Sequence, residues 1–414
     1  MSKVDFKVQT HEEYIQQLSG LIKSGLAADV IIMTMNLYLK PGSLYYKFAR
    51  TMLEAKKLQS GNFEIRYDKN YANRTAVLSD GHYVLMYSFW DPQNWLKKIA
   101  PHKVVKKNQE EFAKILVDSP SRFFDIPTSS NWLKRRLSRH LLQGHAANHA
   151  KSAVINLKNG EQWASLLNGE LVSDVEQNNL VLTIKNNPKA SQFVEKATNP
   201  NAEIGSRGWT EEEIFPKGRL VVDYGNYGEP GQLSRIHDLV EVMLSPLHNT
   251  KSEGGELQKS RPKRVIMITQ YAPTGRILEA LRRASLPKKQ GGYGARVVVP
   301  LEPDGNYRRI DPGFQIMVNN FMKHKGSNVL SPILKYPTHV KCLLARYDDG
   351  TASMIFGTDN FDSLSDSFYR NTELNLYIDR VKKGEDGYKI IVSMLKKLAE
   401  IGDISTEEAE KFLD

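Results

Sequence analysis

The sequence contains a single cysteine, Cys342, among 414 residues. An intramolecular disulfide and a cysteine-based zinc site are therefore excluded. No apolar run approaches the roughly 18 residues that a membrane helix needs, and the longest one, Val30 to Met35, has the length of a buried strand. The first residues, MSKVDFKVQTHEEY, lack the apolar core of a signal peptide. These absences predict a cytoplasmic protein whose contact with a membrane is at most peripheral.

Positive charge is in excess, because 57 Lys and Arg face 47 Asp and Glu and give a formal net charge of +10. Such a balance suits an anionic partner, which can be nucleic acid, an anionic membrane surface or a phosphorylated substrate. A basic surface that serves only solubility is the alternative. The apolar fraction of 40% and the charged fraction of 25% are those of an ordinary globular protein with room for two domains.

Similar segments recur in the same order in two parts of the chain. Each part has an apolar strand-like run, an amphipathic helix, a second strand and a further helix candidate. Strands that alternate with helices indicate a mostly parallel sheet covered by helices. We therefore predict an α/β protein of two similar α/β/α halves with mostly parallel sheets and a pseudo-two-fold relation. The matched segments are 30–36, 45–58, 63–68 and 108–118 in the first half and 265–270, 275–286, 295–304 and 311–324 in the second.

The segment between the halves differs in composition and contains loop-like stretches such as SEGGELQKSRPKR and YGNYGEPG. It also holds a strand candidate at 219–224 and a helix candidate at 236–244. The predicted organisation is a first half at 1–197, a connecting segment at 198–262, a second half at 263–383 and a C-terminal helical cap at 384–414.

A His-x-Lys motif comes at the same stage of each half, as His149 and Lys151 in the first and His339 and Lys341 in the second. On a strand, residues i and i+2 point to the same face, so each His is expected to project together with its Lys. Hydroxyl and amide residues follow each motif and are predicted to lie near the same pocket. They are Ser165 and Asn168 in the first half and Thr358 and Asn360 in the second.

This set of side chains suits a phosphodiester substrate. Lysines neutralise phosphoryl oxygens, and amides and hydroxyls donate to the charge that develops in the transition state. One imidazole can attack phosphorus, while the other protonates the leaving oxygen and then activates the acceptor. The scheme needs neither a metal nor an organic cofactor. A zinc site at His145 and His149 is the weaker interpretation, because Ala146 stands where a zinc protease has Glu.

The duplicated motif resembles that of the phospholipase D superfamily, which is His-x-Lys, four residues, Asp, and then Gly-Ser/Thr-x-Asn. The resemblance covers nearly the whole chain and implies a metal-independent reaction through a phosphohistidine. Two departures are plain: the family Asp is replaced by Asn156 and Arg346, and the first half has lost the Gly and gained one residue. The tyrosyl-DNA phosphodiesterase branch of the family also lacks this Asp, so its loss does not imply an inactive enzyme.

The resemblance implies phosphodiester hydrolysis or phosphatidyl transfer on glycerophospholipids, because segment 178–197 is similar to the cardiolipin and phosphatidylserine synthase branch. It assigns His149 as the nucleophile and His339 as the general acid, then base. A nuclease or DNA-repair phosphodiesterase with the same two histidines is the second interpretation. A catalytically eroded relative that binds lipid or nucleic acid is the third.

Overall fold

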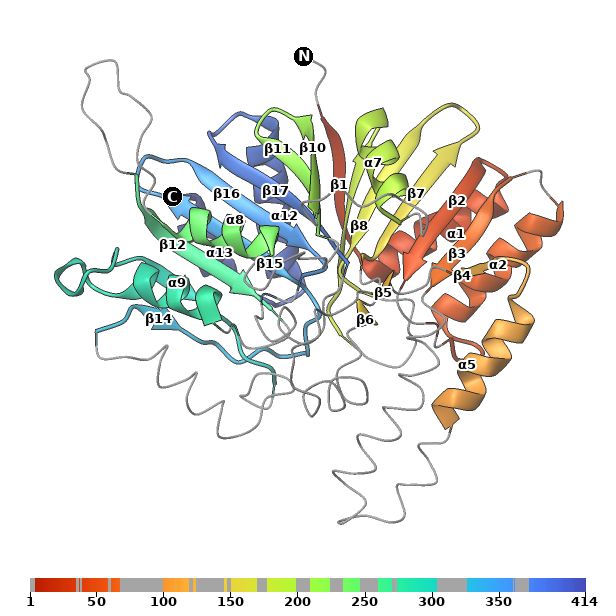
Figure 1. Ribbon diagram of the computed structural model, residues 1–414, viewed down its shortest axis with the longest axis horizontal. Coiled ribbons are helices and arrows are strands. Elements are labelled where there is room, and N and C mark those ends of the chain that lie inside the picture. Colours follow the sequence, from red (N-terminus) through yellow and green to blue (C-terminus); the bar gives the residue numbers. More distant parts are fainter. Residues whose placement is uncertain are drawn as a thin grey trace, which may run out of the picture.

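The structure is a computed structural model. It describes residues 4–34, 37, 39–58, 61–67, 100–118, 122–123, 145–146, 150–169, 177–198, 209–223, 234–245, 260–269, 273, 275–303, 326–359, 361 and 372–414. Two large sheets organise these residues, and Figure 1 shows them side by side, the first on the right and the second on the left.

The first sheet has seven strands in the order β1-β9-β8-β7-β2-β3-β4. Neighbours from β1 to β2 are antiparallel, whereas β2, β3 and β4 are parallel. The strands are β1 Asp5–Thr10, β9 Leu180–Lys185, β8 Gln162–Leu167, β7 Ser152–Leu157, β2 Ala27–Thr34, β3 Phe63–Tyr67 and β4 Leu116–Asp118.

The second sheet has eight strands in the order β10-β11-β17-β16-β15-β12-β13-β14. Neighbours from β10 to β12 are antiparallel, and β12, β13 and β14 are parallel. The strands are β10 Trp209–Phe215, β11 Gly218–Asp223, β17 Glu373–Val381, β16 Ala352–Gly357, β15 Cys342–Tyr347, β12 Pro262–Ile268, β13 Arg296–Val298 and β14 Val329–Leu330. A separate pair joins β5 Arg122–Phe123 and β6 His145–Ala146.

The prediction of mostly parallel sheets is wrong, because both sheets are mixed and most of their strand pairs are antiparallel. The reason lies in two tight turns that the helix–strand alternation concealed. Asn159-Gly160 joins β7 to β8 and Asp349-Gly350 joins β15 to β16, and both glycines have positive φ, 87° and 79°. Asn-Gly and Asp-Gly are strong hairpin signals. The same strand order recurs in both sheets, while a pseudo-two-fold axis between them stays a prediction.

Helices cover the outer faces of the two sheets. The first sheet buries Tyr14 and Phe48 from α1 and α2, and the second buries Leu239 and Leu281 from α8 and α9. No helix in the described ranges is long and apolar enough to cross a membrane. The outer helices are α1 His11–Lys23, α2 Leu44–Leu58, α5 Ala100–Glu111, α8 Arg235–Leu244 and α9 Gly275–Ser285, which is followed by the 3-10 turn η1 Lys288–Gln290.

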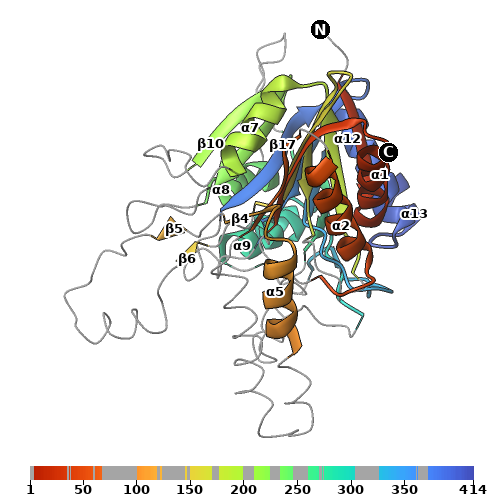
Figure 2. The ribbon, with the colours of Figure 1, turned by 90° about the vertical axis from the view of Figure 1, so that its right-hand side faces the viewer.

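The inner faces share one core. Leu166 and Leu182 of the first sheet belong to the same buried cluster as Leu344 and Phe356 of the second. Helices α7 Pro188–Thr198, α12 Asp386–Glu400 and α13 Thr406–Leu413 complete this cluster, and Figure 2 shows α12 and α13 next to α1. Because both sheets bury apolar surface in one core, their relative position is fixed by packing.

Polar contacts of α12 reinforce this arrangement. Lys397 of α12 donates to Glu13 of α1 at 3.1 Å, and the backbone N–H of Val4 donates to Asp386 at 3.1 Å. The C-terminal helix therefore joins the beginning of the chain to the second sheet.

Most predicted elements are confirmed, including β2, α2, β3, β12 and α9. The helix predicted at 108–118 is only partly right: α5 covers its first four residues, and β4 covers its last three. The helix predicted at 311–324 lies outside the described residues. The predicted connecting segment supplies β10, β11 and α8, so it contributes two strands to the second sheet.

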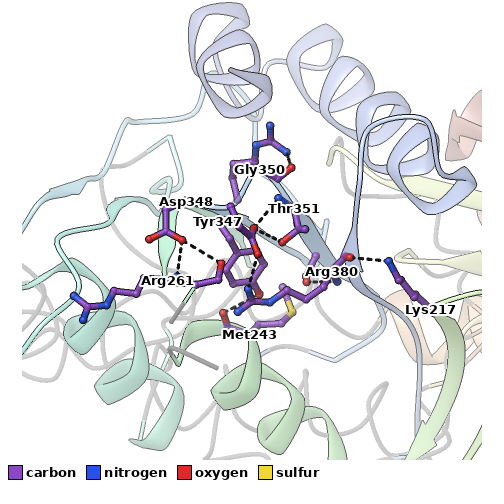
Figure 3. Close-up of polar contacts among 12 residues, drawn as sticks. Lys217, Met243, Arg261, Tyr347, Asp348, Gly350, Thr351 and Arg380 are labelled. Carbon is purple, nitrogen blue, oxygen red and sulfur yellow. Dashed lines mark hydrogen bonds and ion pairs between the residues drawn. The ribbon is translucent and has the colours of Figure 1, made fainter. Parts of the chain in front are cut away.

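The turn of the β15–β16 hairpin is held by the contacts in Figure 3. The Tyr347 hydroxyl donates to the Met243 carbonyl at 3.0 Å, and the Arg380 guanidinium lies 3.5 Å from the centroid of the Tyr347 ring. Asp348 accepts from the backbone N–H of Arg261 at 2.9 Å. These contacts tie the hairpin to α8, β17 and the start of β12.

The shared core predicts a large effect of a cavity in α12. Ile391 is fully buried in that core, so Ile391→Ala should lower the free energy of unfolding by about 2–5 kcal/mol. Lys396→Ala, on the exposed side of the same helix, should change it by less than about 0.5 kcal/mol. Urea unfolding curves measure both, and equal effects would contradict the placement of α12 in the core.

Candidate active site at the ends of the His-x-Lys hairpins

The two hairpins that follow the His-x-Lys motifs have matching hydrogen-bond registers. Ser152 pairs with Leu166 in the first hairpin and Cys342 with Phe356 in the second, an offset of 190 residues on both strands (152 to 342 and 166 to 356). His149 and His339 are separated by the same 190 residues in the sequence. The motifs therefore enter their hairpins at the same point.

Backbone contacts extend the match beyond the strands. Asn168 donates its N–H to the Leu180 carbonyl and Thr358 donates its N–H to the Leu374 carbonyl, both at 3.1 Å. Asn168 of the first half thus occupies the position of Thr358 in the second. The sequence had paired Ser165 with Thr358, which is wrong by three residues.

One contact brings the two halves together at this edge. The Nδ1 atom of His339 lies 2.6 Å from the backbone oxygen of Asn168. The Asn168 side chain donates in turn to the carbonyl of Gly357 at the end of β16. A residue of the first sheet is therefore bonded to both the motif histidine and the strand end of the second sheet.

Lys341 lies against the same imidazole. Its Nζ atom is 2.9 Å from Nδ1 and 3.2 Å from Nε2 of His339, and it donates to the Asn168 oxygen at 3.4 Å. Lys341 is fully buried and His339 is half-buried. The predicted joint projection of His339 and Lys341 is confirmed by these contacts, although residues 339–341 precede the strand.

The contact with Asn168 determines which imidazole nitrogen is available. A carbonyl oxygen only accepts, so Nδ1 must carry a proton when it bonds to Asn168. The neutral ring then has its lone pair on Nε2, where Lys341 can donate to it. Proton transfer to and from an outside group would therefore use Nε2.

Thr358 has a different environment from the one predicted. Its hydroxyl donates to Glu373 at 2.5 Å and accepts from the backbone N–H of Leu374 at 3.0 Å. Both side chains are buried. Glu373 begins β17, the strand that the sequence analysis compared with the family strand after the second motif, but its carboxylate was not singled out.

Ser165 is not brought to His339. Its hydroxyl accepts from the Tyr14 hydroxyl at 2.9 Å and lies 3.0 Å from that of Thr183. Its strand neighbours Trp163 and Leu167 pack in the core on the α1 side, whereas Ala164 and Leu166 face the shared core. Side chains alternate along a strand, so Ser165 points into the α1 layer and its predicted contact with phosphate loses its basis.

Two predicted site residues, His149 and Asn360, lie outside the described residues. Lys151 is fully buried, and its carbonyl accepts from the N–H of Leu167 at 3.0 Å. Lys341 makes the equivalent contact with Gly357 at 3.3 Å. The roles of His149, Lys151 and Asn360 stay predictions.

The described ranges contain no group of three or more His, Cys, Asp and Glu side chains able to hold a metal ion. The part of the chain that surrounds His339 supplies an ammonium, an imidazole and amide groups instead.

No protein-family model matches the sequence, and no curated protein matches it. Among solved structures, the polyphosphate kinase of Porphyromonas gingivalis is similar, with a TM-score of 0.50 and 11% identity over 95% of this chain. The match covers 50% of that kinase, so the chain spans about half of its length.

Two further structures are similar at slightly lower scores. They are phosphatidylserine synthase of Haemophilus influenzae Rd KW20 (TM-score 0.49, 10% identity, 96% of this chain and 86% of that chain) and yeast tyrosyl-DNA phosphodiesterase (TM-score 0.48, 9% identity, 91% and 90%). The polyphosphate kinase belongs to the phospholipase D superfamily. The fold of this chain is phospholipase D-like.

The phospholipase D-like fold explains why the motif Asp can be absent. Arg346 stands at that position and donates to the Gly350 carbonyl at the hairpin turn and, at 3.4 Å, to the Leu413 carbonyl. In the first half, Asn156 donates to Asp29 of the neighbouring strand at 3.3 Å. Seven residues of extended chain span roughly 23 Å. Both replacements therefore lie at the far end of the strand from the histidine and act within the sheet.

The geometry predicts the tautomer of His339. In the neutral ring the proton should reside on Nδ1, because the Asn168 oxygen accepts from it. Nitrogen-15 NMR of histidine-labelled protein, with His339→Gln to assign the signal, measures this directly. A neutral His339 with its proton on Nε2 would contradict the contact.

Proposed function

We propose that this chain hydrolyses a phosphodiester or transfers a phosphatidyl group through a phosphohistidine, and that its substrates are glycerophospholipids. The contact of His339 and Lys341 with Asn168 carries the proposal, because it places an imidazole and an ammonium of one sheet beside a residue of the other. The phospholipase D-like fold agrees with phosphoryl-group chemistry.

His149 would be the nucleophile in this scheme. Its imidazole nitrogen forms a bond to phosphorus, while the bond from phosphorus to the leaving oxygen breaks. His339 gives the proton on Nε2 to that oxygen. Water or an alcohol then gives its proton to His339 and attacks phosphorus, which breaks the bond to His149 and restores both rings.

The lysines would hold the non-bridging phosphoryl oxygens. A protonated His339 beside the Lys341 ammonium is a like-charge pair, and an anionic phosphodiester between them offsets that repulsion. Lys151, Asn168, Thr358 and Asn360 are proposed to complete the phosphate site, and Ser165 is left out for the reason given above.

An exposed apolar segment supports a lipid substrate. Leu330, Ile333 and Tyr336 are 39%, 63% and 50% exposed, and the chain runs from Tyr336 directly to His339. The ammonium of Lys335 lies 5.2 Å from the centroid of the Tyr336 ring. Apolar side chains with a Tyr and a Lys are typical of segments that rest in the headgroup region of an anionic membrane.

Mutants of the two histidines should behave differently with bis(4-nitrophenyl) phosphate. In His339→Ala the attack of His149 should persist, because nitrophenolate leaves without a proton, and the phosphoryl adduct should accumulate when the base for the second step is missing. His149→Ala should form no adduct. Intact-mass spectrometry in the presence of a chelator measures both, with His237→Gln as the control for a remote buried histidine.

An adduct on His149→Ala with none on His339→Ala would reverse the roles. Normal turnover with no adduct in any variant would contradict the covalent scheme, and loss of turnover with the chelator would contradict metal independence.

The exposed segment gives a test of the substrate class. The double change Ile333→Ser and Tyr336→Ser should weaken binding to phosphatidylglycerol vesicles roughly tenfold or more, since each buried apolar side chain is worth about 1.5–3 kcal/mol. It should leave turnover of the soluble diester unchanged. Leu58→Ser is the matched control, because Leu58 is 84% exposed at the end of α2.

Vesicle sedimentation and headgroup release measure these effects. Cleavage of single-stranded DNA without headgroup release would identify the nuclease class instead. Vesicle binding without any turnover, of lipid or of diester, would identify a non-catalytic relative.

A further inference from the structure

A buried carboxylate joins the two halves immediately before His339. Asp403 is fully buried in the turn between α12 and α13. Its Oδ2 atom accepts from the Thr338 hydroxyl at 2.7 Å, and its Oδ1 atom accepts from the Asn178 amide at 2.7 Å. Thr338 precedes His339 in the second half, whereas Asn178 precedes β9 in the first sheet.

The C-terminus of α12 fixes this carboxylate in place. Gly402 has a left-handed φ of 79°. Its N–H donates to the Ala399 carbonyl at 3.2 Å, and the N–H of Asp403 donates to that of Leu398 at 2.9 Å. These two bonds form the Schellman motif that ends a helix at glycine. The position of Asp403 is therefore set by the end of a helix that lies in the shared core.

Both partners of Asp403 hold the backbone of His339. The N–H of His339 donates to the Asn178 carbonyl at 2.8 Å. On the other side, the N–H of Val340 donates to the Thr338 hydroxyl at 3.1 Å, and that hydroxyl passes its own proton to Asp403. The second amide hydrogen of Asn178 goes to the Ile401 carbonyl at 3.0 Å.

We propose that Asp403 is a positioning residue for His339, which it holds against the first half through Thr338 and Asn178. Asp403 acts through these two residues and does not touch the substrate. Its part in catalysis rests on the function proposed above, whereas its hold on the His339 backbone does not.

The strength of this hold should depend on the charge of Asp403. Burial raises the pKa of Asp403 to about 7, against the opposite effect of the hydrogen bonds from Asn178 and Thr338. The Glu302 carboxylate raises it further, and the thiol of Cys342 on β15 also faces Asp403. The ionised form accepts both hydrogen bonds with charge assistance, which makes them stronger than those of the neutral acid. His339 should therefore be held more firmly above about pH 7.

The effect on folding has the opposite sign. The folded-state pKa is higher than the unfolded value of 3.8, so the folded protein binds the proton more tightly. The contribution of Asp403 to stability is therefore greatest below about pH 4 and is lost as the pH rises to about 7. Asp403→Asn should remove this part of the pH dependence.

The hold can be measured without any activity. In the His339→Gln protein, which has no imidazole at this position, the amide signal of Val340 should shift with a midpoint near pH 7, because that amide donates to the hydroxyl bonded to Asp403. Adding Asp403→Asn should abolish the shift, and adding Asp386→Asn should leave it. Asp386 is a matched control, since it also links α12 to the first half, at Val4.

The catalytic part uses the otherwise unmodified chain and bis(4-nitrophenyl) phosphate. Asp403→Asn and Thr338→Val should each lower kcat roughly 10- to 100-fold with little change in KM, as a small misplacement of a catalytic group does. In Asp403→Asn the inflection of kcat near pH 7 that belongs to Asp403 should disappear. Thr338→Ser, which keeps the hydroxyl, and Asp386→Asn should retain kcat within about twofold of wild type.

The two arms fail separately. No hydrolysis of any phosphodiester by the wild type would overturn the proposed function, while the Val340 titration would still test the hold. A Val340 shift that survives Asp403→Asn, or an unchanged kcat and pH profile in Asp403→Asn and Thr338→Val, would overturn the role of Asp403.

Discussion

The position of the first sheet against the second at the level of His339 is the constraint on which the site depends. Two sheets that share an apolar core can still slide by a fraction of an ångström, because dispersion contacts have little direction. Hydrogen bonds remove that freedom here: Asn168 bonds to His339 and Gly357, and Asn178 bonds to the chain on either side of Thr338. Apolar packing thus sets the approach of the halves, and a few polar bonds set their register.

Much of this arrangement is readable in the sequence. The apolar runs of β2 and β12 and the periodic helices α2 and α9 are local signals, and each was predicted close to its observed bounds. The two His-x-Lys motifs gave the stage of each half at which the site forms. The equal offset of 190 residues in strand register and motif spacing shows why the repeat carried information.

Other features depend on contacts between residues far apart in the chain. Ser165 was selected because a hydroxyl was expected near Asn168, but strand alternation turns it toward Tyr14. The antiparallel pairs follow from Asn159-Gly160 and Asp349-Gly350, a local signal that the helix–strand alternation outweighed. Asp403 could not have been selected, because nothing in a helix end indicates that its carboxylate will meet Thr338, 65 residues away.

The central claim is that His149 and His339 serve one phosphorus atom between the two halves. A crystal structure of the protein with vanadate, which adopts the five-coordinate geometry of a phosphoryl group in transfer, tests it most directly. The prediction is one vanadate between the imidazoles, with Nε2 of His339 at hydrogen-bond range of one of its oxygens and His149 bonded to vanadium. Histidines more than about 10 Å apart, or vanadate bound to only one of them, would contradict it.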